Sequence, residues 1–308
     1  MSHNIVTPTS RAAAPERSPR PDDRPRSRRK WYRRAVGKPS LLVYGFLSFV
    51  VLASVFPLYW SFLIGSGDST TVNDPNMSWI PGGNFVQNVQ SVVENPNVNF
   101  WPALRNSIIV SGVTAASVVF FSTLAGFAFA KMRFRGRKWL LTAVIATTAV
   151  PSQLGVVPLF ILMSNFGWTG TLGAVIIPGL VTAFGVFWMT QYVGQTIPDE
   201  IVESARVDGA SSFTTFWRII LPIVRPAATM LALFTFVATW TNFFWPFIVL
   251  NPQNPTLPVA LKVLQANYFV DYSIILAGAI FATFPLILLF IVAGKQLVSG
   301  VMQGALKG

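Results

Sequence analysis

The residues best able to take part in chemistry lie between positions 194 and 225, in the segment GQTIPDEIVESARVDGASSFTTFWRIILPIVR. Four acidic side chains and three arginines occur there, with small residues between them. The chain has a single histidine, His3, and no cysteine, so it offers no Ser/His/Asp set, thiolate zinc site or cysteine nucleophile. It also lacks a G-x-x-x-x-G-K-[ST] phosphate loop. We therefore expect this segment to contact another protein, and we expect no catalytic residue, metal or cofactor in the chain.

Two short helices are predicted in this segment. Pro198 suits the first position of a helix, where its missing N–H would have had no partner. Asp199 and Glu200 suit the first turn, because the helix dipole favours negative charge there. Gly209 can adopt the left-handed conformation that ends a helix. The four-residue spacing predicts one shared apolar face, formed by Ile197, Ile201 and Ala205.

The second helix is predicted to follow Ser211 or Ser212, either of which can cap it, and to stop at Pro222. Its apolar residues fall at i, i+3, i+4 and i+7 and would form one stripe: Phe213, Phe216, Trp217 and Ile220. Such a pair of helices can lie flat on lipid, but acids outnumber bases here, which weakens attraction to anionic lipid. We favour a protein-docking surface, because a corner of small residues lets a foreign backbone approach closely: Ser204, Ala205, Gly209, Ala210 and Ser211.

The elements that must position this segment are membrane spans. Hydrophobic residues make up 52% of the chain and charged residues 11%, against about 25% charged residues in a typical soluble domain. Six segments of 22 to 25 residues contain no Asp, Glu, Lys, Arg or His: 41–64, 106–130, 139–163, 172–193, 226–250 and 273–294. Each is long enough to cross roughly 30 Å of hydrocarbon as a helix. The predicted fold class is an all-α polytopic membrane protein with six transmembrane helices, which excludes a soluble enzyme.

The distribution of positive charge predicts the orientation of these helices. If alternate loops face the cytoplasm, 21 of the 23 Lys and Arg residues lie on that side. The positive-inside rule then places both termini in the cytoplasm. The net charge of +12 is therefore a signal of topology, and no motif combining aromatic and basic residues accompanies it to indicate binding to nucleic acid.

Two domains are predicted. Residues 1–38 are rich in Arg, Pro and Ser and cannot bury a core, so we predict a disordered basic cytoplasmic tail. Residues 39–308 then form the six-helix transmembrane domain. In its third span Pro151 and Pro158 flank Gln153, and the loss of backbone donors predicts a kink there. Kinked helices occur both along translocation paths and as ordinary packing features.

The predicted spans contain no ionisable residue, which argues against a proton relay or a voltage sensor. Without a phosphate loop of its own, the chain would need another subunit to drive active transport. An ATP-independent secondary carrier or facilitator and a membrane scaffold that transports nothing are the alternatives that the residues leave open.

The segment 194–225 resembles the signature of ABC-importer permeases, in which Glu-Ala-Ala is followed by a Gly four residues after the second Ala and then by I-x-L-P. Ser204 takes the place of the first Ala in this chain, whose matching runs are Glu203-Ser204-Ala205, Asp208-Gly209-Ala210 and Ile219-Ile220-Leu221-Pro222. Three other features resemble the sugar-uptake branch, of the maltose-permease second-subunit type: Asn106-Ser107, Phe134-Arg135-Gly136-Arg137 and the ending GVMQGALKG at 300–308. The resemblance covers roughly residues 40–308.

This resemblance implies an ABC type I importer permease fold, as a multi-pass protein of the bacterial cell membrane surrounded by lipid. It implies as partners a second homologous permease subunit, two ATPase subunits that bind the ATP, and an extracytoplasmic sugar-binding protein. The loop 194–225 would hold a coupling helix that sits in a groove on the ATPase. The residues implied at that contact are Glu203, Ser204, Ala205, Asp208, Gly209 and Ala210.

The substrate path is a separate expectation. Aromatic faces stack on sugar rings, which makes Trp240 a candidate together with the polar residues Asn242 and Gln153, although Trp is also common at membrane interfaces. In some members of the resembled family the partner permease supplies most sugar contacts. The resemblance suggests a di- or oligosaccharide, such as a cello-oligosaccharide or another glucoside, with an amino-acid or peptide permease as the minor alternative.

Overall fold

The structure is a computed structural model that describes residues 40–70, 72, 78–266 and 270–305, with side chains up to residue 294. The predicted disordered tail 1–38 and the last three residues of the GVMQGALKG ending lie outside the described residues. The chain divides into one unit before Leu58 and a second from Leu58 onward. The second unit carries every site described below.

All regular secondary structure of the described residues is helical, with no strand among them. Four helical segments are long and apolar enough to cross a membrane: Leu41–Gly65 (α2), Phe100–Lys131 (α4), Gly173–Thr196 and Tyr272–Gly294. Two bent helix pairs pass the same test, which makes six spans in the described chain if each pair counts as one. The all-helical prediction with its membrane spans is confirmed.

The third predicted span is broken. Helix α5 (Arg137–Thr147) is followed by a short 3-10 turn, η2 (Ser152–Gly155), and by α6 (Val156–Asn165), and the chain bends by 90° between them. Pro151 lies at the bend and forces the residue before it away from helical geometry. The kink predicted from the two prolines is confirmed, and it leaves Ser152 and Gln153 on an irregular turn.

The fifth predicted span, 226–250, ends earlier than expected. Helix α12 (Arg225–Trp240) stops at Trp240, and a turn leads into the short helix α13 (Phe244–Val249). The uncharged run continues through this turn, so neither charge nor hydropathy marks the end of the helix. At its other end α12 meets the preceding helices, residues 212–223, at an angle of 77°.

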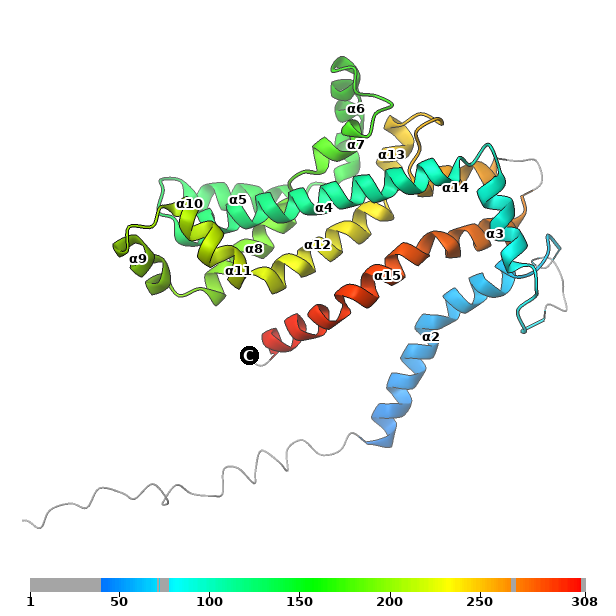
Figure 1. Cartoon of the computed structure of the whole chain (residues 1–308), viewed down its shortest axis with the longest axis horizontal. Coiled ribbons are helices and arrows are strands. Elements are labelled where there is room, and N and C mark those ends of the chain that lie inside the picture. The colour runs from blue at the N-terminus through cyan, green and yellow to red at the C-terminus, as the bar shows by residue number, and fades with distance from the viewer. Residues whose placement is uncertain (1–39, 71, 73–77, 267–269, 306–308) are drawn as a thin grey trace, which may run out of the picture. The chain divides into compact units, whose positions relative to one another are not determined.

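The centre of the second unit is α4, which packs along α12 and along α8 (Ala183–Thr196) (Figure 1). Helices α4 and α8 approach closely at Gly126, which has no side chain. A Cβ at this position would lie only 2.7 Å from the backbone of Met189. Small residues at such crossings let membrane helices approach each other. The C-terminal helix α15 (Tyr272–Ala305) packs against α12 and against α3 (Phe85–Glu94).

The end of α4 on the predicted outer side is tied to the loop after α13. The amide nitrogen of Asn106, a fully buried residue, donates to Asn254 Oδ1 at 2.8 Å and to the Pro255 carbonyl at 2.9 Å. Next to it, Ser107 Oγ accepts a hydrogen bond from the backbone N–H of Leu257, the first residue of α14 (Leu257–Lys262). The Asn106-Ser107 pair therefore holds the loop that leads into α14.

We expect Asn106→Ala to lower the free energy of unfolding by about 1–3 kcal/mol, because it leaves a buried carbonyl without its donor. Thermal unfolding of the purified chain in detergent measures this change. Gln87→Ala, at an exposed position of α3, is the control and should leave the midpoint where it is. Equal thermal unfolding midpoints for the two variants would show that the hydrogen bonds of Asn106 do not stabilise the fold.

Candidate functional site

The first helix predicted in the loop is α9 (Asp199–Val207), which begins directly after Pro198. Gly209 follows two residues after its last residue and terminates it, with a φ of +79° in the left-handed region as predicted. The N–H of Ala210 donates to the Ala205 carbonyl at 2.9 Å, and the N–H of Gly209 donates to the Arg206 carbonyl at 3.0 Å. These two bonds are those of a Schellman motif, which satisfies the last carbonyls of the helix and makes the corner rigid.

The second helix starts as α10 (Ser212–Thr215), and Ser211 caps it by accepting the N–H of Thr214 at 3.2 Å. It continues through a π-helical turn, η4 (Phe216–Ile220), into α11 (Leu221–Ile223), and a break follows Pro222. The cap is confirmed, and the break falls at Val224, two residues after the predicted stop at Pro222.

The predicted apolar stripe of this second helix is only half right. Phe216 and Ile220 are buried, whereas Phe213 is 71% exposed and Trp217 is 42% exposed. The wider π turn and the contact of Phe216 with Phe127 of α4 decide which residues face inward. Phe213 and Trp217 instead pack edge to face on the outside, with ring centroids 6.0 Å apart.

The six residues predicted at the ATPase contact do not all lie on one surface. Glu203, Ser204, Asp208 and Gly209 are exposed, and Ala210 is half-buried. Ala205 is buried, so its methyl group packs inside the chain. The buried face of α9 consists of Val202 and Ala205, which lie in the interior with Ile197, whereas Ile201, predicted to share that face, is exposed.

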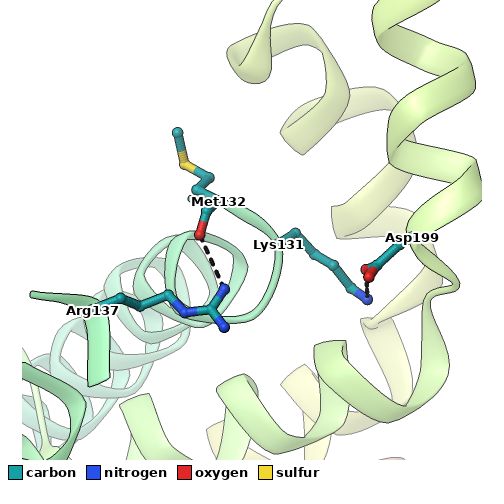
Figure 2. Close-up of polar contacts among 4 residues, drawn as sticks. All are labelled: Lys131, Met132, Arg137 and Asp199. Atoms are coloured by element: carbon teal, nitrogen blue, oxygen red, sulfur yellow. Dashed lines mark hydrogen bonds and ion pairs between the residues drawn. The ribbon is translucent and has the colours of Figure 1, made fainter. Parts of the chain in front are cut away.

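An ion pair joins α9 to the end of α4. Lys131 Nζ lies 2.6 Å from Asp199 Oδ1 (Figure 2). Each charge suits its helix, because Lys131 lies in the last turn of α4 and Asp199 lies in the first turn of α9. The hydrogen bond and positive charge of Lys131 lower the pKa of the Asp199 carboxyl. The Asp199 carboxylate therefore stays charged at neutral pH, and on acidification its charge is lost as the pH falls through this lowered pKa.

A second feature is a cavity of about 290 Å³ in the membrane-spanning part. Its walls come from α4, from the broken third span, from the segment 175–179 and from the turn after α12. No charged side chain lines it. Its polar lining residues are Thr114, Ser152, Gln153, Thr239 and Asn242, and its aromatic lining residues are Phe244 and Trp245.

Thr114 is the most informative residue of this cavity. It is 5% exposed, and its hydroxyl has no hydrogen-bond partner among the described residues. A buried hydroxyl without a partner is costly, and this one belongs to a residue in the wall of the cavity. Gly179 faces Thr114 so closely that a Cβ there would lie 3.3 Å from Thr114 Cγ2.

Two of the three predicted path residues line this cavity, and one does not. Gln153 and Asn242, 89 positions apart in the chain, meet there. Trp240 lies elsewhere: it is 4% exposed, stacks on Phe236 with centroids 5.6 Å apart, and donates its indole N–H to the Ala282 carbonyl of α15. No face of Trp240 remains for a sugar ring. Trp240 is therefore separated from this cavity, because α12 turns its side chain toward α15.

Sequence reasoning missed several lining residues: Thr114, Ser152, Thr239 and Phe244. One signal for Thr114 was available, because Ser107, Ser111 and Thr114 recur at helical spacing in an otherwise apolar span and predict a polar face on α4. For a metal, the described residues hold no group of three or more His, Cys, Asp or Glu.

An all-helical membrane chain with broken spans around a polar cavity and an exposed helical corner in one loop defines a multi-pass permease. Residues 99–295 match the model of the family "binding-protein-dependent transport system inner membrane component". The chain belongs to this family, which places it in the inner (cytoplasmic) membrane as a permease subunit of an ABC transporter, with ATP hydrolysed by a partner ATPase.

Three relatives illustrate the similarity. The arabinooligosaccharides transport system permease protein AraQ of Halalkalibacterium halodurans is 31% identical over 87% of this chain and 96% of its own length. The trehalose/maltose transport system permease protein MalG of Thermococcus litoralis is 27% identical over 90% of this chain and 99% of its own. The crystal structure of a bacterial ABC transporter that imports the acidic polysaccharide alginate has a chain with the same fold, with a TM-score of 0.70 at 20% identity, covering 92% and 99% of the two chains.

Proposed function

We propose that this chain forms one half of the translocation path of an ATP-driven importer for a di- or oligosaccharide. In this proposal a second, homologous permease subunit supplies the other half, and an extracytoplasmic sugar-binding protein delivers the substrate. Two ATPase subunits drive the cycle through the helix α9. The sugar specificities in the names of AraQ and MalG support the substrate class.

The exposed corner of α9 is the observation that carries the proposal. Glu203, Ser204 and Asp208 face outward on a helix whose end is fixed by the Schellman bonds at Gly209. Its first turn is anchored to α4 through Asp199 and Lys131. A helix held at both ends transmits a push from a docked ATPase to the spans, whereas a flexible loop would absorb it.

The cavity around Thr114 supports an uncharged polar solute. Its hydroxyl and amide groups can exchange hydrogen bonds with sugar hydroxyls, and Phe244 and Trp245 offer apolar surface to a ring. A charged amino acid would find no countercharge in this lining. The cavity is partly open, which leaves room for a second permease subunit to complete its wall.

Crosslinking tests the docking role directly, because the chain contains no cysteine that would compete. We expect Ser204→Cys, at an exposed position of α9, to crosslink to an ATPase subunit in native membranes and to lose that crosslink when the ATPase gene is deleted. Ser91→Cys, exposed on α3, is the control and should give no ATPase adduct. Adducts of Ser204→Cys with lipid headgroups alone would contradict the proposal, and sugar uptake into vesicles without ATP would favour a secondary carrier.

A further inference from the structure

A second, larger cavity of about 530 Å³ lies beside α9, between this helix, the end of α4 and the start of α5. Its volume is within the range of ligand sites. Its lining is strongly basic, with five cations and two carboxylates: Lys131, Arg133, Arg137, Lys138, Arg206, Asp199 and Glu203. The permease function described above uses Glu203, Lys131 and Asp199 of this lining but gives no role to the other four cations.

The positive charge of the cavity is not neutralised by the chain. Lys131 is paired with Asp199, and this is the one ion pair within 4 Å in the described part of the chain. Arg133, Arg137, Lys138 and Arg206 are then left facing a single carboxylate, that of Glu203. Such an excess of cations around a cavity attracts an anion.

One of these cations is held in place. Arg137 Nη1 donates to the Met132 carbonyl at 3.1 Å, so its guanidinium spans the turn between α4 and α5 (Figure 2). The turn itself ends at Gly136, with φ of +84°, and α5 starts at Arg137 without a side-chain cap on its first N–H groups. A fixed guanidinium beside a helix N-terminus favours a phosphate group.

The position of the cavity indicates that a phosphate bound there belongs to a membrane lipid. The turn 132–138 separates two uncharged spans, 106–130 and 139–163, so it lies at the surface of the hydrocarbon layer. Two aromatic residues of the cavity wall are exposed, Trp139 by 82% and Phe134 by 41%. Exposed aromatic side chains beside basic ones are typical of the headgroup region of a membrane.

We propose that this cavity binds the phosphate headgroup of an anionic phospholipid on the predicted cytoplasmic side. Arg133, Arg137, Lys138 and Arg206 contact the phosphate, and Trp139 and Phe134 lie against the glycerol and upper acyl region. The lipid then bridges the turn 132–138 and α9, next to the Lys131–Asp199 pair. A lipid in this position stiffens the connection between the spans and the coupling helix.

Native mass spectrometry of the full chain tests this site. The chain is purified from nanodiscs of phosphatidylcholine that contain phosphatidylglycerol, and the retained phosphatidylglycerol is counted. Each basic residue near a membrane surface contributes about 1 kcal/mol, so we expect R133Q/K138Q to weaken retention roughly 30-fold. The matched control R135Q/R218Q removes the same charge from exposed residues that do not line the cavity, and it should retain the lipid as the wild type does.

Each other outcome overturns the proposal. Equal loss in both double variants would show a general charge effect, and no loss in either would show that the cavity does not hold this lipid. Displacement of phosphatidylglycerol by millimolar inorganic phosphate, with phosphate adducts in its place, would make the site one for free phosphate. Retained lipid together with loss of the ATPase subunit from the R133Q/K138Q complex would assign the cations to an acidic segment of that subunit.

Discussion

Replacement of Gly209 by proline is expected to reduce sugar uptake to background, a loss of at least about 100-fold, while the chain still inserts into the membrane. Proline fixes φ near −65° and has no N–H, whereas Gly209 needs φ of +79° and donates to the Arg206 carbonyl. The variant therefore breaks the corner that sets the direction of α9. Uptake in cells and ATPase activity of the reconstituted complex measure the loss, and both should fall together.

A graded series at this position separates backbone geometry from contact with a partner. The space around Gly209 is open, since a Cβ there would meet nothing within 4 Å. Gly209→Asn should therefore keep most of the uptake, because Asn tolerates the left-handed region. Gly209→Ala should fall between, with a strain of about 1–2 kcal/mol. Normal uptake in Gly209→Pro would show that the corner has no part in coupling.

The second large effect is expected from Gly179→Leu, which should close the path around Thr114. The backbone of Gly179 allows a side chain, but a Cβ there points at Thr114 Cγ2 from 3.3 Å and the rest of the leucine enters the 290 Å³ cavity. Uptake should fall to background. Asn242→Leu removes only one polar partner, which at about 0.5–1.5 kcal/mol is a two- to twelve-fold loss. Obstruction therefore outweighs the loss of any single hydrogen bond.

The control for obstruction is Gly173→Leu, in the neighbouring helix α7 (Gly173–Ile176). A Cβ at Gly173 meets only ordinary contacts, at 3.5 and 3.8 Å, and the residue does not line the cavity. Uptake near the wild-type level is expected in this variant. ATPase activity stimulated by the binding protein should persist in both variants, because docking on either side of the membrane is untouched. Similar uptake by the two variants would place the path elsewhere.

Local chemistry predicted the loop well because its signals act over a few residues. The left-handed Gly209, the Ser211 cap and the helix start after Pro198 are each decided within one turn of chain. The spans were found for a similar reason, since crossing the membrane requires a long continuous uncharged segment. The bend at Pro151 also follows from a single residue.

Features that depend on distant contacts could not be predicted in the same way. Trp240 and Asn242 are two positions apart in one uncharged run, yet α15 buries the first and the turn after α12 brings the second to the cavity. The end of α12 has no local marker. Lys131 and Asp199 are separated by 68 positions, so only the packing of α4 along α8 brings them together. The basic cavity beside α9 depends on the same contact.

The unbroken length of α4 has a mechanical consequence. Its 32 residues form a rod of about 48 Å at 1.5 Å per residue, with Asn106 fastened near one end and Lys131 at the other. We expect a displacement of α9 to move the far end of α4 as well, because no break interrupts this helix. The neighbouring third and fifth spans are each interrupted beside the 290 Å³ cavity, so we expect bending during transport to occur in these two spans and not in α4.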